Sequence, residues 1–312
     1  ASVGAVVAAR ARPVFAEVDR WMQLDPADLE RCLTPRTRAI MPVHLNGVVA
    51  DMDPIMEFAR EHGLKVIEDA AQSCGSLYKG RRVGALGDVG CFSFQLEKNI
   101  TSGEGGALVT NDAEVFRRAA IYSDQGGQFW TSHAGVRDNF GGQPVIGENL
   151  RMSEITGAIL GCQLARLEAI LERIERNTSI VRAALSEIEG LDVPPPAPQR
   201  DRHALGVIFY LPDAAAADQV AKALQAEGVP AGKVYGGQPV YAARQILNQW
   251  TIAGGCPFHC PHAYPEPITY TMGMCPRTED YLARGIGVAL GPFYTEEDLD
   301  DIITGVRKVA HH

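Results

Sequence analysis

Short apolar runs alternate with helix-start signals along the first part of the chain. Asp25-Pro26 and Asp53-Pro54 each combine a capping residue with a proline at the first helical position, and each predicts the start of a helix. Gly63 is predicted to end the second of these helices, and Asp112 to cap a third. The runs predicted to form strands are 13–18, 38–43, 64–67, 89–94 and 107–110. This alternation of strands and helices predicts an α/β fold with a largely parallel sheet.

The second half of the chain begins with a helical pattern and then changes character. Ser153 is predicted to cap one long helix, whose apolar positions recur every three or four residues. These positions are Leu160, Leu164, Leu167, Leu171 and Ile174. The prolines within 194–198 predict a linker or rigid turn. Beyond them we expect a strand over 203–211, a helix over 214–227 and a last helix that opens at Thr295 with a capping box.

Both ends of the sequence call for separate interpretation. Residues 1–10 are apolar without a basic leader, and we interpret them as a fragment of a buried helix, so that the sequence starts inside a domain. His311 and His312 are interpreted as residues of a purification tag.

Composition narrows the class of protein. The chain has 312 residues, 46% of them hydrophobic and 21% charged, which is ordinary for a globular protein of one large or two modest domains. A net charge of −9 argues against a nucleic-acid-binding surface, which needs a basic stripe. The seven scattered cysteines predict reduced thiols in a cytoplasmic protein. No apolar run approaches the length that spans a membrane.

Two candidate catalytic residues follow predicted strands. Lys98 lies in FSFQLEKNITSGEGG, residues 92–106, just beyond a strand, where a desolvated amine can form a Schiff base with a carbonyl cofactor. Asp69 ends the strand before it. Ligands of parallel sheets bind beyond the carboxyl ends of the strands, so one site could hold both side chains. Taken singly, Lys98 also fits a solvated surface lysine, and Asp69 a helix cap or an ion-pair partner.

Two polar segments have competing interpretations. Residues 126–148 predict a long functional loop or lid, in which His133 and Arg137 could bind an anionic substrate or could be ordinary surface residues. Cys256, His259, Cys260 and His262 could be drawn as a metal site. Their spacing is not a standard zinc pattern, so we expect no metal there, and instead a loop near the mouth of the substrate site.

Several short motifs occur together in one order. The segments are 42–44 with Gly47, 51–52, 68–73, 87–88, 92–94, Lys98, 103–106 and 147–154. In this order and spacing the chain resembles the DegT/DnrJ/EryC1/StrS family of sugar aminotransferases. The resemblance extends over essentially the whole chain and is densest between residues 12 and 167.

That resemblance implies an enzyme that uses pyridoxal 5′-phosphate (PLP). Lys98 matches the family's Schiff-base lysine, and Asp69 matches the carboxylate that pairs with the pyridine nitrogen and favours its protonated form. Gln72 matches a residue near the cofactor's ring oxygen, and Ser93 one that binds its phosphate. Asn149 matches a residue that reaches the phosphate from the neighbouring subunit, which implies a homodimer with shared active sites.

The resemblance also implies the architecture and the reaction. It implies the fold of type I PLP-dependent transferases, with a large domain over 1–172, lacking its N-terminal part, and a smaller C-terminal α+β domain over 173–312. The reaction would move an amino group from Glu or Gln to a keto-sugar or keto-sugar acid. QLEKNITSGEGG and MCPRTEDYLAR are most similar to the branch that forms 8-amino-3,8-dideoxy-octulosonate. A Gly-Thr helix start and a ring-stacking aromatic residue of the family do not occur upstream of Pro13, so we expect them in a segment that the sequence lacks.

Two other functions are weighed against this one. A PLP-dependent sugar dehydratase or cyclase would share the fold, but the family's dehydratases carry histidine in place of the lysine, whereas Lys98 is present. A non-catalytic PLP-binding regulatory protein is disfavoured by the intact pair of Lys98 and Asp69.

Overall fold

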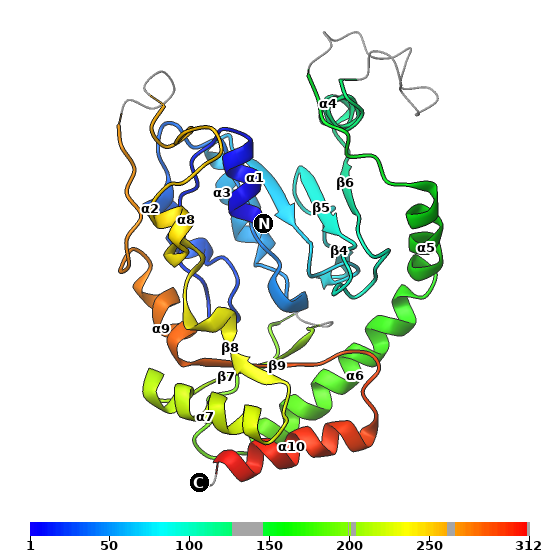
Figure 1. Cartoon of the computed structure of the whole chain (residues 1–312), viewed down its shortest axis with the longest axis vertical. Helices are drawn as coiled ribbons and strands as arrows, with labels where there is room; N and C mark the ends of the chain where they lie inside the picture. Colours follow the sequence, from blue (N-terminus) through cyan, green and yellow to red (C-terminus); the bar gives the residue numbers. More distant parts are fainter. Residues whose placement is uncertain (127–145, 199, 201–203, 261–265, 311–312) are drawn as a thin grey trace.

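The chain forms a four-stranded sheet and, later in the sequence, a three-stranded sheet, and helices pack around both (Figure 1). The computed structural model describes residues 1–126, 146–198, 200, 204–260 and 266–310. Among these, no helix is long and apolar enough to cross a membrane. All seven cysteines are free thiols.

The elements have the following bounds. The α-helices are α1 (Ser2–Ala8), α2 (Leu29–Cys32), α3 (Met52–Glu61), α4 (Ala113–Ser123), α5 (Glu154–Leu164), α6 (Leu167–Ser186), α7 (Ala214–Ala226), α8 (Arg244–Leu247), α9 (Pro276–Arg284) and α10 (Glu296–Ala310). The strands are β1 (Ala39–Ile40), β2 (Lys65–Asp69), β3 (Leu77–Tyr78), β4 (Arg81–Arg82), β5 (Val89–Ser93), β6 (Gly106–Thr110), β7 (Gly206–Tyr210), β8 (Ala231–Lys233) and β9 (Gly285–Ala289). The 3-10 helices are η1 (Pro26–Asp28), η2 (Leu45–Gly47), η3 (Val234–Gly237) and η4 (Val240–Ala242).

The larger sheet has the strand order β1-β2-β5-β6. β1 pairs with β2 and β2 with β5 in parallel, whereas β5 and β6 are antiparallel neighbours. In the β2–β5 register Asp69 lies opposite Cys91. The carboxyl ends of β2 and β5 therefore meet at one edge of the sheet, as the predicted α/β fold requires.

One face of this sheet packs against α3. Ile55 and Met52 of α3 are fully buried together with Val66 of β2 in one apolar cluster. The loop that contains Gly84 also approaches β5 closely, because a Cβ at Gly90 would lie 2.3 Å from the Cα of Gly84. Gly90 thus lets the loop that contains Gly84 lie directly against β5.

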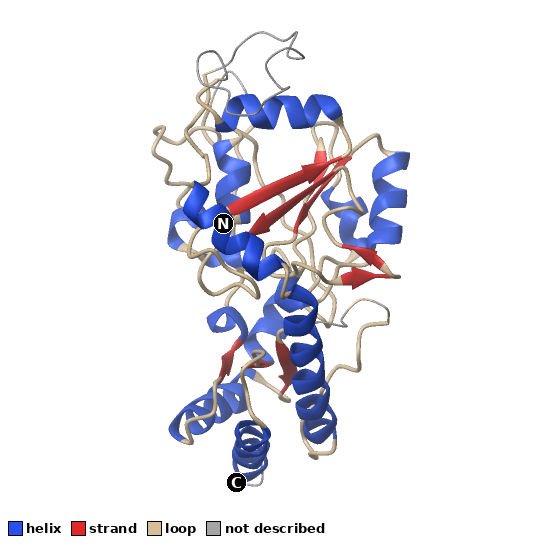
Figure 2. Ribbon diagram, turned by 90° about the vertical axis from the view of Figure 1, so that its right-hand side faces the viewer, coloured by secondary structure: helices blue, strands red, loops and turns tan. Residues whose placement is uncertain are grey.

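The smaller sheet, β7-β9-β8, is antiparallel and packs on α6, α7 and α10 (Figures 1 and 2). Phe209 and Ile286 of the sheet are fully buried against Leu185, Leu224 and Ile302 of the helices. α6 is continuous across residues 172 and 173, where the sequence suggested a domain boundary, and Figure 1 shows it leading from α5 toward the smaller sheet.

The predicted strand over 13–18 is wrong, since the segment contributes only an isolated bridge between Val18 and Leu24. Side chains accept the hydrogen bonds from backbone amides that a neighbouring strand would otherwise have accepted. The amide of Glu17 donates to Asp28 at 2.7 Å, and that of Val18 to Thr278 at 3.0 Å. The backbone is thereby satisfied without a ladder.

The single long helix predicted after Ser153 is instead two helices, α5 and α6, which are broken at Ala165 and Arg166. The break coincides with a change of environment, because α5 has no buried residue in this chain whereas α6 buries a stripe that includes Ile174 and Val181. α1 is helical as expected but has no buried residue, so its interpretation as a buried helix is wrong within this chain.

The predicted helix starts are mostly confirmed. Asp25 accepts from the amide of Ala27 at 2.9 Å, and Asp112 accepts from that of Glu114 at the same distance. Thr295 and Asp298 form the capping box at the start of α10. The start of α3 is displaced, because Asp51 rather than Asp53 is its N-cap.

Candidate active site

Asp69 ends β2 with its carboxylate held from two directions. The Ser2 hydroxyl donates to Oδ2 at 2.6 Å, and the amide of Ala71 donates to Oδ1 at 3.2 Å. These donors leave further lone pairs of the carboxylate available. Because Ser2 begins α1, the bond also ties that helix to the strand end (Figure 1).

Lys98 and Ser93 belong to the neighbouring strand end. Ser93 is the last residue of β5, two positions beyond the partner of Asp69. Lys98 follows in a turn closed by its amide, which donates to the carbonyl of Gln95 at 3.0 Å, and Asn99 anchors the turn through the carbonyl of Cys74. Lys98 is half-buried, and no described carboxylate forms an ion pair with its ammonium group.

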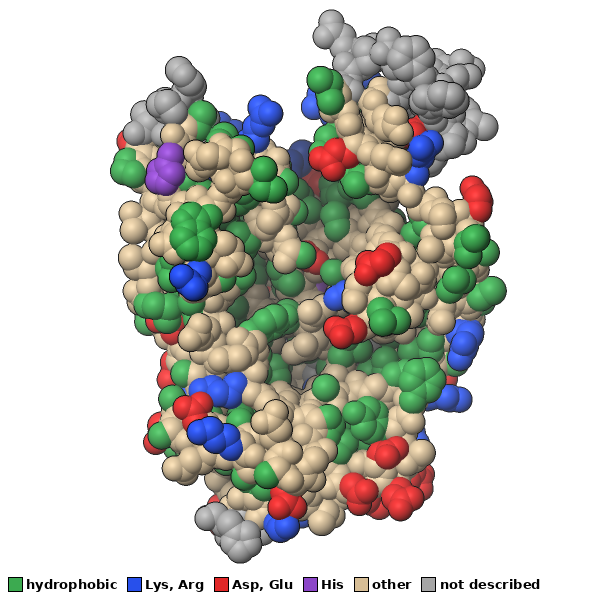
Figure 3. All heavy atoms as spheres, in the orientation of Figure 1, with side chains coloured by type: hydrophobic (Ala, Val, Ile, Leu, Met, Phe, Trp, Pro, Cys, Tyr) green, Lys and Arg blue, Asp and Glu red, His purple; other side chains and the backbone are tan. Residues whose placement is uncertain are grey.

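The molecular surface is hollowed between the part that carries α1 and α8 and the part that carries β5 and β6, with charged side chains in the hollow (Figure 3).

Gln72 connects the strand end of β2 to the smaller sheet's side of the molecule. Its Oε1 accepts from the amide of Asn46 at 2.9 Å, and its Nε2 donates to the hydroxyl of Tyr235 at 3.2 Å. Tyr235 belongs to η3. The sequence did not identify it as a site residue, because residues 236–274 and those just before them have no periodic pattern. The only available signal was the unusual Tyr-Gly-Gly run at residues 235–237.

Glu68 precedes Asp69 but has the opposite environment. Its side chain is fully buried and accepts from the amides of Gly84, Leu86 and Gly87 at 2.6–2.8 Å. It also lies 3.0 Å from Nε2 of His44, whose Nδ1 accepts from the amide of Ala50, so Nε2 carries the proton and donates to Glu68.

These contacts determine the charge of Glu68. Burial opposes ionisation, but the hydrogen bonds from His44 and from the amides of Gly87 and Gly84 favour it, and the pKa of Glu68 is lowered. We call Glu68, His44 and the three amide donors the Glu68 cluster. This cluster holds the end of β2 on the face opposite to the side chain of Asp69.

The remaining predicted residues are not joined to this group. Asn149 is exposed, accepts from Nε of Arg151 at 3.1 Å, and pairs in an isolated bridge with Asp124 between α4 and α5. His133 and Arg137 lie outside the described residues. Thus Asp69 and Ser93 lie at the ends of adjacent strands, Gln72 and Lys98 lie in the segments that follow them, and Asn149 lies on the surface of its own chain.

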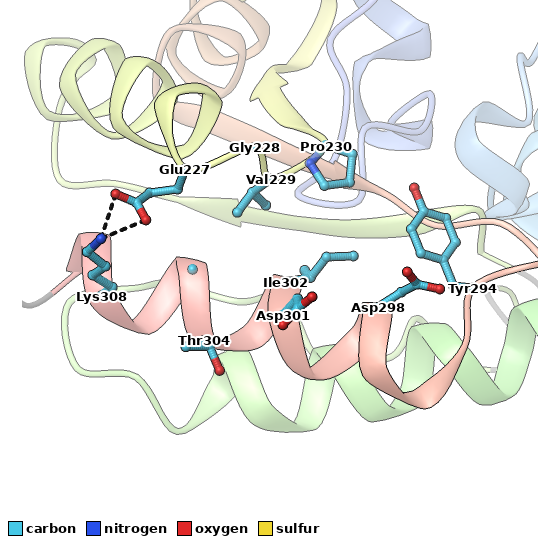
Figure 4. Close-up of a pocket in the computed structure, with 11 residues that line it drawn as sticks. Glu227, Gly228, Val229, Pro230, Tyr294, Asp298, Asp301, Ile302, Thr304 and Lys308 are labelled. Carbon is cyan, nitrogen blue, oxygen red and sulfur yellow. Dashed lines mark hydrogen bonds and ion pairs between the residues drawn. The ribbon is translucent and has the colours of Figure 1, made fainter.

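A metal site and a ligand cavity are the other possible kinds of site in the chain. Among the described residues no group of His, Cys, Asp and Glu is placed to hold a metal ion; His262 lies outside that part of the chain. A cavity of about 480 Å³ lies between α10 and the segment that follows α7, where Lys308 and Glu227 form an ion pair at 2.8 Å (Figure 4). None of the predicted site residues lines it. A second cavity, of about 500 Å³, reaches both Asn46 and Tyr235, the two partners of Gln72.

The strand-end residues fit the functional groups of PLP. Asp69 offers a carboxylate for a protonated ring nitrogen, and Lys98 an amine for the aldehyde. The Ser93 hydroxyl accepts one long bond, 3.4 Å from the amide of Gln95, and can donate its own proton to an acceptor such as a phosphate oxygen.

The comparisons with known proteins agree with this chemistry. The model of the DegT/DnrJ/EryC1/StrS aminotransferase family matches residues 1–252. The chain is 34% identical to the UDP-N-acetyl-3-dehydro-alpha-D-glucosamine 3-aminotransferase of Acidithiobacillus ferrooxidans, over 100% of the chain and 75% of that protein. It is also 34% identical to the L-glutamine:2-deoxy-scyllo-inosose aminotransferase of Streptoalloteichus tenebrarius, over 100% of the chain and 74% of that protein. The structure of DesV from S. venezuelae, solved with a ketimine intermediate, superposes with a TM-score of 0.80 at 31% identity, covering 100% of this chain and 76% of that one.

Fold and site together define a PLP-dependent aminotransferase of the α/β class. More narrowly, the chain belongs to the DegT/DnrJ/EryC1/StrS aminotransferase family, and its relatives include sugar aminotransferases.

Proposed function

We propose that the protein transfers an amino group from Glu or Gln to a keto-sugar or keto-sugar acid in a PLP-dependent reaction. The observation that carries the proposal is that Asp69 and Ser93 end adjacent parallel strands, with Lys98 in the turn that follows Ser93. The named substrates of the relatives, a dehydro-glucosamine nucleotide and an inosose, support a polyol ketone as acceptor. L-glutamine in one relative's name supports the donor.

Each residue has a role in this proposal. Bound PLP supplies an electron-accepting ring to which the migrating amino group is attached. Asp69, held by Ser2 and Ala71, would pair with the ring nitrogen, and an ionised carboxylate there favours the protonated ring. Lys98 would hold the cofactor through Nζ and, once released by the substrate's amine, would move a proton between the substrate carbon and the cofactor. Ser93 would bind the phosphate, and Gln72 would lie near the ring oxygen.

The proposal includes a homodimer with shared active sites, in which Asn149 of each subunit reaches the phosphate of the other. α5 supports it, because this helix is apolar on all sides and yet has no buried residue in its own chain. Ile155 is 75% exposed and Leu164 is 57% exposed. Light scattering should find a dimer for the wild type and for Ile155→Leu, and dissociation for Ile155→Asp; a monomeric, active wild type would contradict the shared site.

Finer assignments remain part of the proposal. His133 and Arg137 are proposed as substrate contacts, the reducing cytoplasm as the compartment that keeps the seven thiols free, and the 8-amino-3,8-dideoxy-octulosonate branch as the narrowest substrate assignment. The division into a large domain over 1–172 and a small domain over 173–312 is likewise proposed.

Absorbance tests the function directly. The purified protein with PLP should show a band at roughly 400–430 nm, typical of PLP bound to a lysine, which Lys98→Ala removes and the surface control Lys308→Ala retains. Glutamate or glutamine alone should then convert the band to the pyridoxamine form with release of the keto acid. A band without conversion by any common amino donor would favour the regulatory protein or the dehydratase or cyclase. No band at all would exclude every PLP function.

A further inference from the structure

The amide of Gln72 is fixed in one orientation. Its Oε1 accepts from a backbone amide, that of Asn46, which can only donate. Its Nε2 must therefore face Tyr235 and donate to the phenol oxygen. Consequently the phenol proton of Tyr235 is not used by Gln72.

Tyr235 is held in an unfavourable backbone conformation. Its φ of 49° and ψ of 34° lie in the left-handed region, as do the angles of Gly236 after it. A tyrosine there costs about 1 kcal/mol and persists where the surrounding structure requires it. The turn is anchored by Val234, which is buried against Met22 and Leu282.

The phenol of Tyr235 is suited to donate rather than to ionise. Burial of the hydroxyl end raises its pKa, the bond from Gln72 opposes that shift, and the charge of Asp69 adds to it. The residue as a whole is 58% exposed, so the ring borders open space. Among the described residues, Gln72 is the one hydrogen-bond partner of the hydroxyl.

We infer that Tyr235 is a substrate-contacting residue whose phenol donates a hydrogen bond to a hydroxyl group of the keto-sugar. The inference rests on the proposed function and assigns part of its specificity to the smaller sheet's side of the molecule. A neutral donor held by Gln72, three residues beyond Asp69, suits an alcohol oxygen, whereas the carboxylate of an amino-acid donor calls for a cation. Tyr235 therefore acts on the acceptor step and not on the donor step.

Tyr235→Phe tests this assignment because it removes only the hydroxyl. The two steps are measured separately on protein loaded with PLP: the donor step with glutamine and glutamate, and the acceptor step with the pyridoxamine form. The acceptor probes are UDP-N-acetyl-3-dehydro-α-D-glucosamine and 2-deoxy-scyllo-inosose, the ketones in the names of the two relatives. Tyr294→Phe, which removes a phenol at the distant cavity of Figure 4, is the matched control.

The acceptor step of Tyr235→Phe should slow about tenfold in second-order rate, as for loss of one hydrogen bond to a substrate hydroxyl, while the donor step stays within about twofold. Tyr294→Phe should change neither step. Equal losses in both steps, or an unchanged acceptor step, would overturn the assignment. A wild type that completes the donor step but aminates neither of these ketones, nor the 8-keto-octulosonate of the proposed branch, would contradict the keto-sugar acceptor and this inference with it. A wild type without a donor step would contradict the proposed function itself.

Discussion

The two sides of the end of β2 carry adjacent carboxylates with opposite surroundings. On one face of the strand, the Glu68 carboxylate is fully buried, and its oxygens accept hydrogen bonds from the three backbone amides of the loop at residues 84–87. On the open side, Asp69 is half-buried and is held by two donors, and Gln72, three residues further on, donates to Tyr235. Successive side chains of a strand point to opposite faces, so one strand end can serve stability on one side and chemistry on the other.

This contrast makes amide substitutions of the two neighbours informative. Asp69→Asn should lower turnover by about 10²- to 10³-fold, the range for removing one preorganised electrostatic contact, and leave the free energy of unfolding within about 1 kcal/mol. Steady-state kinetics and urea unfolding measure the two effects. Asp53→Asn, in an exposed pair with Lys79, is the control and should change neither. Near-normal turnover in Asp69→Asn would remove the carboxylate from the chemistry.

Glu68→Gln should have the reverse effect. Its amide NH₂ would face the buried amides or His44, so at least one charged hydrogen bond is lost and a buried donor is left without an acceptor. The free energy of unfolding should fall by roughly 3 kcal/mol, measured by urea unfolding. Turnover per folded molecule should change far less than in Asp69→Asn; an equally large catalytic loss would break the division between the two faces.

The pH dependence of stability should separate the two faces by a smaller amount. The pKa of Glu68 is lowered below its unfolded value of 4.5, so its contribution is fully present above that value and is lost as the pH falls through the folded pKa. Between about pH 7 and pH 3 the wild type should therefore lose more stability than Glu68→Gln. Urea unfolding at several pH values measures the difference, and parallel curves would show that Glu68 does not titrate as its contacts require.

The smallest effect is expected at the turn of the open face. Tyr235→Gly relieves the left-handed strain but loses the bond from Gln72, so the free energy of unfolding should stay within about 1 kcal/mol of the wild type. Thermal unfolding checks this. A loss of 2 kcal/mol or more would mean that Tyr235 supports the fold rather than the open site.

The sequence predicts the regular part of the molecule better than its irregular part. The parallel strands and the caps at Asp25 and Asp112 are confirmed, because their signals are local. The absent strand over 13–18 depends on side chains as distant as Thr278, which no local pattern reveals.

The candidate site shows the same limit. The strand-end position of Asp69 follows from an apolar run, but its neighbour Glu68 is buried only because a glycine loop folds over it. The hydrogen bond between Gln72 and Tyr235 joins residues 163 positions apart. Both partners of the Gln72 amide, Asn46 and Tyr235, have left-handed backbone conformations. Such contacts are set by tertiary packing, and the sequence pattern carries no trace of them.

The account depends most on Lys98 as the cofactor's anchor. Reduction of the PLP-loaded protein with borohydride, followed by peptide mass spectrometry, locates the lysine that binds the cofactor. We expect a reduced pyridoxyl adduct on the peptide that contains Lys98, and no adduct there after Lys98→Ala. An adduct on another lysine, such as Lys233, or no adduct at all, would contradict it.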